Sequence, residues 1–311
     1  MQRLPKIVVH IATAITATAS WAAHAQSLDW QQVSQQDKSA LTFAIPIGTE
    51  EKLPLYACRA EAGEGVHPGR FRNDFSGCHI GFGGKEISVM PFEVLASAWQ
   101  DGKEGGIPFN SFVGGQRVKS AQPGFNLIPL FPCRASYQGT LQLGEVAADD
   151  KGCSFGFGGR QVTEQKYQVL WAAPWLSWNT GIVHQIPSDA VSAGSEGSET
   201  FYICRAHDQI GLHPGKIKQG APGCSMASDG KEVITAQFSI LTLHWLPGHA
   251  GTIPIAAIPT GNERRALLFL CRAQVRDTVQ IGKIDEELAS CHVGMIGAEM
   301  TSQSYDVLSE P

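Results

Sequence analysis

The residues with the clearest chemistry in this chain are eight cysteines, which form four pairs of one spacing. The second cysteine of each pair stands 20 positions after the first. Paired thiols either form disulfides or hold zinc, and zinc needs four clustered ligands at short spacings that these pairs lack. Pro68 and Gly69 lie midway between the first two cysteines, and Pro-Gly favours a tight turn that would bring both thiols together. We therefore predict four disulfides, each worth roughly 3 kcal/mol in the chain-entropy model: Cys58–Cys78, Cys133–Cys153, Cys204–Cys224 and Cys271–Cys291.

Other reactive residue types do not form a recognisable catalytic site in the sequence. Cys78-His79 and Cys291-His292 place a nucleophile beside a base, but adjacent residues of a strand point to opposite faces. His67 and His213 each precede a proline without nearby Cys or carboxylate partners, so we interpret them as turn or rim residues. There is no Gly-x-Ser-x-Gly elbow, P-loop, His-Glu-x-x-His or glycosidase-like carboxylate pair. The sequence predicts a protein that is not an enzyme, with no catalytic residue, metal or cofactor.

The cysteines belong to a unit that occurs four times. Each first cysteine begins Cys-Arg-Ala and is followed 11 positions later by a glycine, and each second cysteine is followed by a glycine six positions later. A tryptophan precedes three of the units at one distance from an Ile-Pro, and we expect Trp99, Trp178 and Trp245 to pack in the core. The unit boundaries that we predict are 26–97, 98–172, 173–243 and 244–311.

A second periodicity overlies the first. Repeats one and three share Gly-x-His-Pro-Gly, ending at Gly69 and Gly215, whereas repeats two and four share Thr-x-Gln-x-Gly, ending at Gly144 and Gly282. This alternation indicates that a two-repeat unit was duplicated. We therefore expect two intertwined pairs, 26–172 and 173–311.

The local pattern is that of β-strands throughout. Short apolar runs rich in β formers end at each Cys-Arg-Ala. Each repeat closes on an aromatic-polar-aliphatic alternation, as in Tyr167-Gln168-Val169-Leu170, which places the aromatic and aliphatic side chains on one face of a strand. The predicted fold class is all-β, made of four tandem antiparallel repeats of short strands.

The amino terminus predicts export. Arg3 and Lys6 precede an apolar stretch, and small residues at Ala23 and Ala25 are typical of a signal peptide cleaved after Ala25. We therefore expect residues 1–25 to be removed and the protein to be secreted or periplasmic, with no transmembrane segment. Residues 1–25 hold two basic and no acidic residues, so the net charge of -5 becomes -7 in the mature chain, which argues against a nucleic-acid partner.

The repeat resembles the DM9 (DM-nine) repeat over nearly the whole mature chain. The resemblance rests on Trp, Ile-Pro, a small-residue stretch ending in Gly, a strand with Arg-Ala, then Pro-Gly-Lys, Gly-Gly-Lys-Glu and an aromatic-x-Val-Leu ending. Its clearest instances are Arg205-Ala206, Pro214-Gly215-Lys216 and Gly83-Gly84-Lys85-Glu86. The paired cysteines depart from the usual motif. The family includes small mannose-binding lectins and the amino-terminal part of natterin-type toxins, so the resemblance implies an all-β fold in which paired repeats exchange strands.

The resemblance also implies binding residues. In the family's lectins, mannose is held by the Lys of Pro-Gly-Lys and by an acidic residue shortly after the upstream Gly. A carboxylate accepts hydrogen bonds from vicinal hydroxyls while an ammonium donates to their oxygens. Repeat two carries the two positions with reversed charge, as Arg117 and Glu145, which is expected if the two side chains meet in space. The sugar-binding residues that we predict are Glu196 with Lys216, Glu263 with Lys283, and Glu50 with Arg70.

The function that these features favour is carbohydrate binding, with mannose-type glycans as ligands. Glu stands where the family's lectins have Asp, so the identity of the sugar stays open. The alternative is a structural or protein-interaction module of the cell envelope, with an envelope protein as partner, in which the charges only bridge repeats. We expect repeats three and four to bind most tightly, through exposed side chains whose removal changes stability little.

Overall fold

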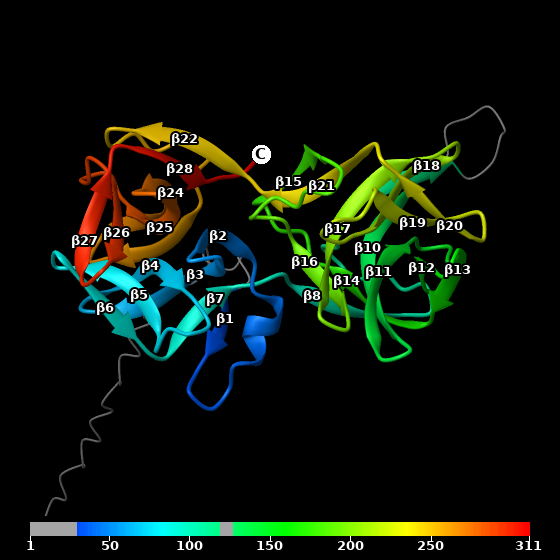
Figure 1. Ribbon diagram of the computed structural model, residues 1–311, viewed down its shortest axis with the longest axis horizontal. Coiled ribbons are helices and arrows are strands. Elements are labelled where there is room, and N and C mark those ends of the chain that lie inside the picture. Colours follow the sequence, from blue (N-terminus) through cyan, green and yellow to red (C-terminus); the bar gives the residue numbers. More distant parts are fainter. Residues whose placement is uncertain (1–29, 119–126) are drawn as a thin grey trace, which may run out of the picture.

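The computed structural model describes residues 30–118 and 127–311, so the predicted signal peptide lies outside the described residues. The described chain is built of antiparallel strands with one short 3-10 helix, as the sequence predicts. Two lobes lie side by side, each formed by one 14-stranded sheet (Figure 1). Within the described ranges, no helix is long and apolar enough to cross a membrane.

The terminal lobe is the first of these and contains repeats one and four, coloured blue-cyan and orange-red in Figure 1. The strands of repeat one are β1 (Trp30–Val33), β2 (Pro46–Glu50), β3 (Leu53–Ala62), β4 (Gly65–Phe71), β5 (Cys78–Phe82), β6 (Lys85–Val89) and β7 (Phe92–Leu95), with the 3-10 helix η2 (Ser39–Phe43) after β1. Those of repeat four are β22 (Trp245–His249), β23 (Pro259–Glu263), β24 (Ala266–Val275), β25 (Thr278–Ile284), β26 (Cys291–Met295), β27 (Ala298–Ser302) and β28 (Ser304–Leu308).

The middle lobe contains repeats two and three, coloured green to yellow in Figure 1. The strands of repeat two are β8 (Trp99–Lys103), β9 (Gly115–Val118), β10 (Leu127–Tyr137), β11 (Thr140–Val146), β12 (Cys153–Phe157), β13 (Arg160–Glu164) and β14 (Lys166–Leu170). Those of repeat three are β15 (Leu176–Thr180), β16 (Ser192–Glu196), β17 (Glu199–His207), β18 (Gly211–Ile217), β19 (Cys224–Ser228), β20 (Lys231–Thr235) and β21 (Phe238–Leu243).

The intertwined pairs are not those predicted from the sequence. Strand β4 of repeat one pairs with β23 of repeat four, and β9 and β11 of repeat two pair with β18 and β16 of repeat three. The expected pairs 26–172 and 173–311 are therefore wrong. An alternating order gives each lobe one repeat with His-Pro-Gly and one with Gln-x-Gly under either pairing, so the alternation does not distinguish the two arrangements.

All four predicted disulfides are present. Cys58–Cys78 has an S–S distance of 2.02 Å and a Cα–Cα distance of 5.8 Å, and the other three bridges are closely similar. The expected turn at Pro68-Gly69 is wrong, because both residues lie inside β4, opposite Arg59 and Cys58. Gly69 is needed because a Cβ there would overlap the carbonyl oxygen of His79 on the next strand.

Among the described residues, the hydrophobic core has one central part and four smaller parts. The central cluster takes buried side chains from all four repeats, among them Leu55, Leu143, Ile203 and Leu270, around Trp175. Each smaller cluster surrounds one disulfide. The tryptophans that begin the repeats pack against the central cluster and are partly buried, which agrees with the predicted core role.

Candidate functional site

The predicted basic position lies on the strand that follows Cys-Arg-Ala in each repeat. It comes directly after the glycine that packs closely against the next strand. Arg70, Glu145, Lys216 and Lys283 occupy it, and all four are buried. Neighbouring side chains of a strand alternate between faces, so the residue after the glycine points away from the disulfide toward the partner repeat. The expectation that these side chains are exposed is wrong.

The partner repeat supplies a polar side chain that the sequence interpretation missed. It comes from the residue two positions before the glycine, which is His67, Gln142, His213 or Gln280, and each is essentially inaccessible to solvent. Gln142 meets Lys216, His67 meets Lys283, His213 meets Glu145 and Gln280 meets Glu50. The interpretation of His67 and His213 as rim residues is therefore wrong. A polar residue recurring inside an otherwise apolar strand was the available signal.

The repeat-three site contains Lys216, whose hydrogen-bond partners are neutral, whereas Lys283 of repeat four lies near a carboxylate. Lys216 Nζ donates to the side-chain oxygen of Gln142 and, at 2.6 Å, to the carbonyl oxygen of Gly156, both on repeat two. Burial lowers the pKa of Lys216 to about 8, against the opposing attraction of Glu232 and Glu196. Lys216 and Glu196 line the same cavity of about 560 Å³, together with Ser225, Glu232 and Phe201.

The repeat-four site brings its predicted acid and base into contact. Lys283 Nζ lies 3.7 Å from Glu263 Oε2 and 3.1 Å from His67 Nδ1. Because an ammonium can only donate, Nδ1 accepts, and the ring proton lies on Nε2, which donates to the carbonyl oxygen of Ala62 at 3.0 Å. Burial and the adjacent Lys283 lower the pKa of His67. His67 is thus held neutral.

The repeat-one site is closed by its own charges. Arg70 donates to Glu50 and Glu86 at 2.8 Å each and to the carbonyl oxygen of Gly294 at 2.8 Å. Burial opposes ionisation of Glu86, but hydrogen bonds from His79, the Gly297 amide and Arg70 together lower the pKa of that carboxyl to about 2. Every nitrogen of the Arg70 guanidinium is therefore occupied within the protein.

The predicted pair of repeat two is not a direct ion pair. Arg117 instead contacts Asp149 and Asp150, at 2.8 and 2.7 Å. Glu145 contacts His213 Nδ1 at 2.9 Å, and Asp208 lies 3.1 Å from the other ring nitrogen. Burial opposes the imidazolium, but the two carboxylates raise the pKa of His213, while burial raises the pKa of Glu145.

A reciprocal contact locks each pair of repeats together. Glu86 accepts a hydrogen bond from the amide of Gly297, and Glu299 accepts one from the amide of Gly84, at 2.7 and 3.1 Å. Glu232 and Gln161 do the same with Gly159 and Gly230 in the middle lobe, at 2.9 and 3.1 Å. Each site therefore depends on turns of both repeats, which fixes the position of its buried base.

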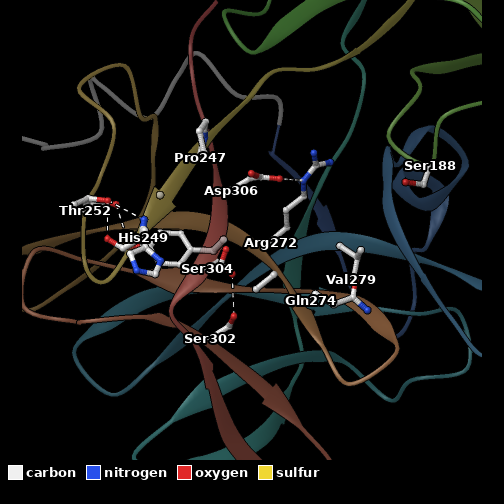
Figure 2. Close-up of a pocket in the computed structure, with 13 residues that line it drawn as sticks. Ser188, Pro247, His249, Thr252, Arg272, Gln274, Val279, Ser302, Ser304 and Asp306 are labelled. Carbon is white, nitrogen blue, oxygen red and sulfur yellow. Dashed lines mark hydrogen bonds and ion pairs between the residues drawn. The ribbon is translucent and has the colours of Figure 1, made fainter.

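A second cavity lies on the terminal lobe, with Ser188 of the middle lobe also lining it. It measures about 740 Å³ and is lined mainly by polar residues of β22, β24 and β28 (Figure 2). Arg272 lies in its centre, bonded to Asp306 and to Asp189 of the middle lobe at 3.0 Å each. The cavity is therefore polar, and Asp306 and Asp189 already balance the charge of Arg272.

The adjacent Cys-His residues, which the sequence analysis does not interpret as catalytic, have no free thiol. Both cysteines are in disulfides, while His79 and His292 lie beside Glu86 and Glu299. In the described ranges, no cluster of three or more His, Cys, Asp or Glu side chains is placed to hold a metal ion. The acids near these histidines are those that lock the repeats together.

Comparison with known proteins identifies the repeat. The profile of the DM9 repeat matches residues 48–122, 126–235 and 198–302. No curated protein matches the chain in sequence. Among solved structures, the crystal structure of the nematode sperm cell motility protein MFP2B matches 86% of this chain and 94% of its own, with 13% identity and a TM-score of 0.18.

Proposed function

Because the chain belongs to the DM9 repeat family, we propose that it is an exported, non-catalytic protein that binds carbohydrates. The ligand class that we infer is mannose-type glycans, bound first in the repeat-three cavity. The observation that carries this proposal is Lys216, a buried ammonium in a cavity that also contains Glu196. Four disulfides fit an extracellular or secreted protein.

The donor and acceptor count of the repeat-three cavity suits a sugar. An ammonium has three hydrogens, and Lys216 uses two of them on Gln142 and Gly156, so one remains for a hydroxyl oxygen. Glu196 can accept hydrogen bonds from hydroxyl groups. Phe201 adds an apolar wall against which the ring carbons of a sugar can pack.

The four sites are expected to differ in affinity. Lys283 is held near Glu263 and a neutral His67, so the repeat-four site offers the same chemistry as repeat three. Each nitrogen of Arg70 already donates to Glu50, Glu86 or Gly294, and the two carboxylates neutralise its charge, so we expect weaker binding at the repeat-one site. Repeats three and four therefore supply most of the binding, and repetition adds avidity on a multivalent glycan.

The test is calorimetric titration of the purified protein with methyl α-mannoside. Glu196→Gln keeps the shape but removes the charge, and we expect it to weaken binding at least tenfold because charge-assisted hydrogen bonds are the stronger kind. Glu61→Gln, an exposed change in the other lobe, is the matched control and should bind like the wild type. Equal binding by Glu196→Gln and wild type would reject this site.

A structural role in the envelope is the second candidate. The observation that favours it is that the charges of repeats one and two are engaged inside the protein: Arg70 pairs with Glu50 and donates to the carbonyl oxygen of Gly294 in repeat four, and Glu145 pairs with His213 of repeat three. A glycan array decides between the candidates: no glycan bound by folded protein, together with specific capture of one envelope protein, would replace carbohydrate binding.

A further inference from the structure

The arginine of Cys-Arg-Ala is stacked on a tryptophan in every repeat. The guanidinium carbon lies 4.7, 4.4, 4.3 and 4.5 Å from the ring centroid in repeats one to four. Arg205 lies on the same sheet face as Lys216, because Ile203 stands opposite Lys216 and is two residues before Arg205 on its strand. Its guanidinium stacks on Trp178 and does not line the repeat-three cavity. The arginine–tryptophan pairs form a second set of equivalent positions, which the proposed mannose sites do not use.

Three of these arginines have an oxygen acceptor on the strand beside them. Each acceptor stands directly opposite its arginine, on the last strand of the repeat. Arg Nε donates to Glu93 at 2.5 Å in repeat one, to Gln168 at 2.9 Å in repeat two and to Asp306 at 3.0 Å in repeat four. Figure 2 shows the last of these pairs.

Repeat three departs from this pattern at one residue. Ser239 stands opposite Arg205, and its hydroxyl is too short to take the place of a carboxylate. Arg205 Nε is buried and has no hydrogen-bond partner in the described part of the chain. Burial lowers the pKa of Arg205, with no carboxylate acting against it. A buried donor left without an acceptor costs about 1–3 kcal/mol, so the position favours an acceptor from outside.

Repeat one gives a matched reference for the same position. Arg59 stacks on Trp30, and its Nη1 donates to the carbonyl oxygen of Thr260 at 3.2 Å. Arg205 stacks on Trp178, and its Nη1 donates to the carbonyl oxygen of Gly114 at 3.3 Å. The two arginines share these two contacts and differ in the residue opposite, which is Glu93 in one case and Ser239 in the other.

We propose that Arg205, stacked on Trp178, binds the carboxylate of a ligand in the place that Glu93 fills in repeat one. The ligand enters over Ser239, which is partly exposed, and beside it the exposed Thr180 adds a second hydroxyl. The planar fork of arginine suits a carboxylate. That the carboxylate belongs to a uronic acid rests on the proposed carbohydrate binding; the carboxylate site itself does not.

The experiment follows the Arg205 Nε–H resonance by NMR, assigned with Arg205→Lys, during titration with sodium D-glucuronate. Methyl α-glucoside is the neutral control and N-acetylaspartate is the carboxylate of a peptide. We expect a saturable shift with glucuronate and none with the glucoside. Ser239→Glu should weaken glucuronate binding at least tenfold by supplying the internal carboxylate. The reciprocal change, Glu93→Ser, should give Arg59 the same response.

Each outcome decides one part of the proposal. No saturable shift at Arg205, or an unchanged shift in Ser239→Glu, overturns the carboxylate site. N-acetylaspartate binding as tightly as glucuronate overturns the uronic acid and assigns the carboxylate to a peptide. Mannoside binding in the repeat-three cavity is measured separately with Glu196→Gln, so failure of one site is distinguishable from failure of the other.

Discussion

Lys216→Met tests whether Lys216 is buried in the repeat-three cavity in its charged, protonated form. The side chain keeps its length and loses the ammonium, so Gln142 and Gly156 lose their donor. That loss has the same cost at every pH. The pH dependence of the stability difference between the two proteins therefore reports the titration of Lys216 itself.

The magnitude follows from the lowered pKa. Burial brings the pKa of Lys216 from 10.5 to about 8. Between these values the unfolded chain binds more protons than the folded chain, so the free energy of unfolding rises with pH. One pH unit corresponds to about 1.4 kcal/mol, so the wild type should gain roughly 2 kcal/mol over Lys216→Met between pH 7 and 9.5. A mannoside that binds the ammonium should shift this rise to higher pH.

The assay is urea unfolding with disulfides intact at pH 7, 8, 9 and 9.5. Lys103→Met, which removes an exposed lysine of the same lobe, is the control and should follow the wild type at every pH. Parallel pH curves for the wild type and Lys216→Met would show that this ammonium is solvated, and the account of the cavity given above would be refuted.

Three further predictions concern His67, His213 and the amino terminus. The lowered pKa of His67 means that the unfolded chain binds more protons below about pH 6.5, so acidification destabilises the terminal lobe, and His67→Gln should remove this loss. The raised pKa of His213 acts in the opposite direction: its stability is present below about pH 6.5 and is lost as pH rises through the folded pKa, so His213→Gln should flatten that slope. Urea unfolding from pH 5 to 8 measures both effects. If the two substitutions changed the pH dependence of stability in the same direction, the opposite roles of His67 and His213 would be contradicted. Amino-terminal sequencing of the exported protein should begin at Gln26, and an intact Met1 would reject the cleaved signal peptide.

The fold could be predicted largely because its strongest constraints are local. A pair of cysteines 20 residues apart and a strand pattern of period two are properties of one repeat. The glycines are equally informative, but the sequence does not show why a glycine is needed at each position. Gly69 looks like a turn residue after Pro68, yet it stands in a strand where the carbonyl oxygen of His79 leaves no room for a side chain. A single sequence does not distinguish a glycine needed for a turn from one needed for close packing.

The candidate site could be predicted only in part, because half of it comes from another repeat. The acid and base of repeat four lie in contact as expected, but His67 beside them is 216 positions away from Lys283. Nothing local indicates which repeats exchange strands. The burial of the lysines was missed for the same reason, since the strands that cover them belong to the partner repeat.

The reversed charges of repeat two show that the charge of this site is balanced across repeats, whereas the ion pairs of Arg70 and Lys283 lie within one repeat. Arg117 and Glu145 suggest a swapped pair, but Glu145 is instead balanced by His213 of repeat three. Where the base is a lysine, the partner residue is neutral: Gln142 for Lys216, and His67 held in its neutral form for Lys283. A lysine facing a second cation would be repelled, and a buried glutamate facing glutamine would lack a counter-charge. The residue two positions before the glycine therefore decides which charge the opposite repeat can bury, and the carboxylates around that charge, such as Glu50 and Glu86 at Arg70, decide how much of it remains for a ligand.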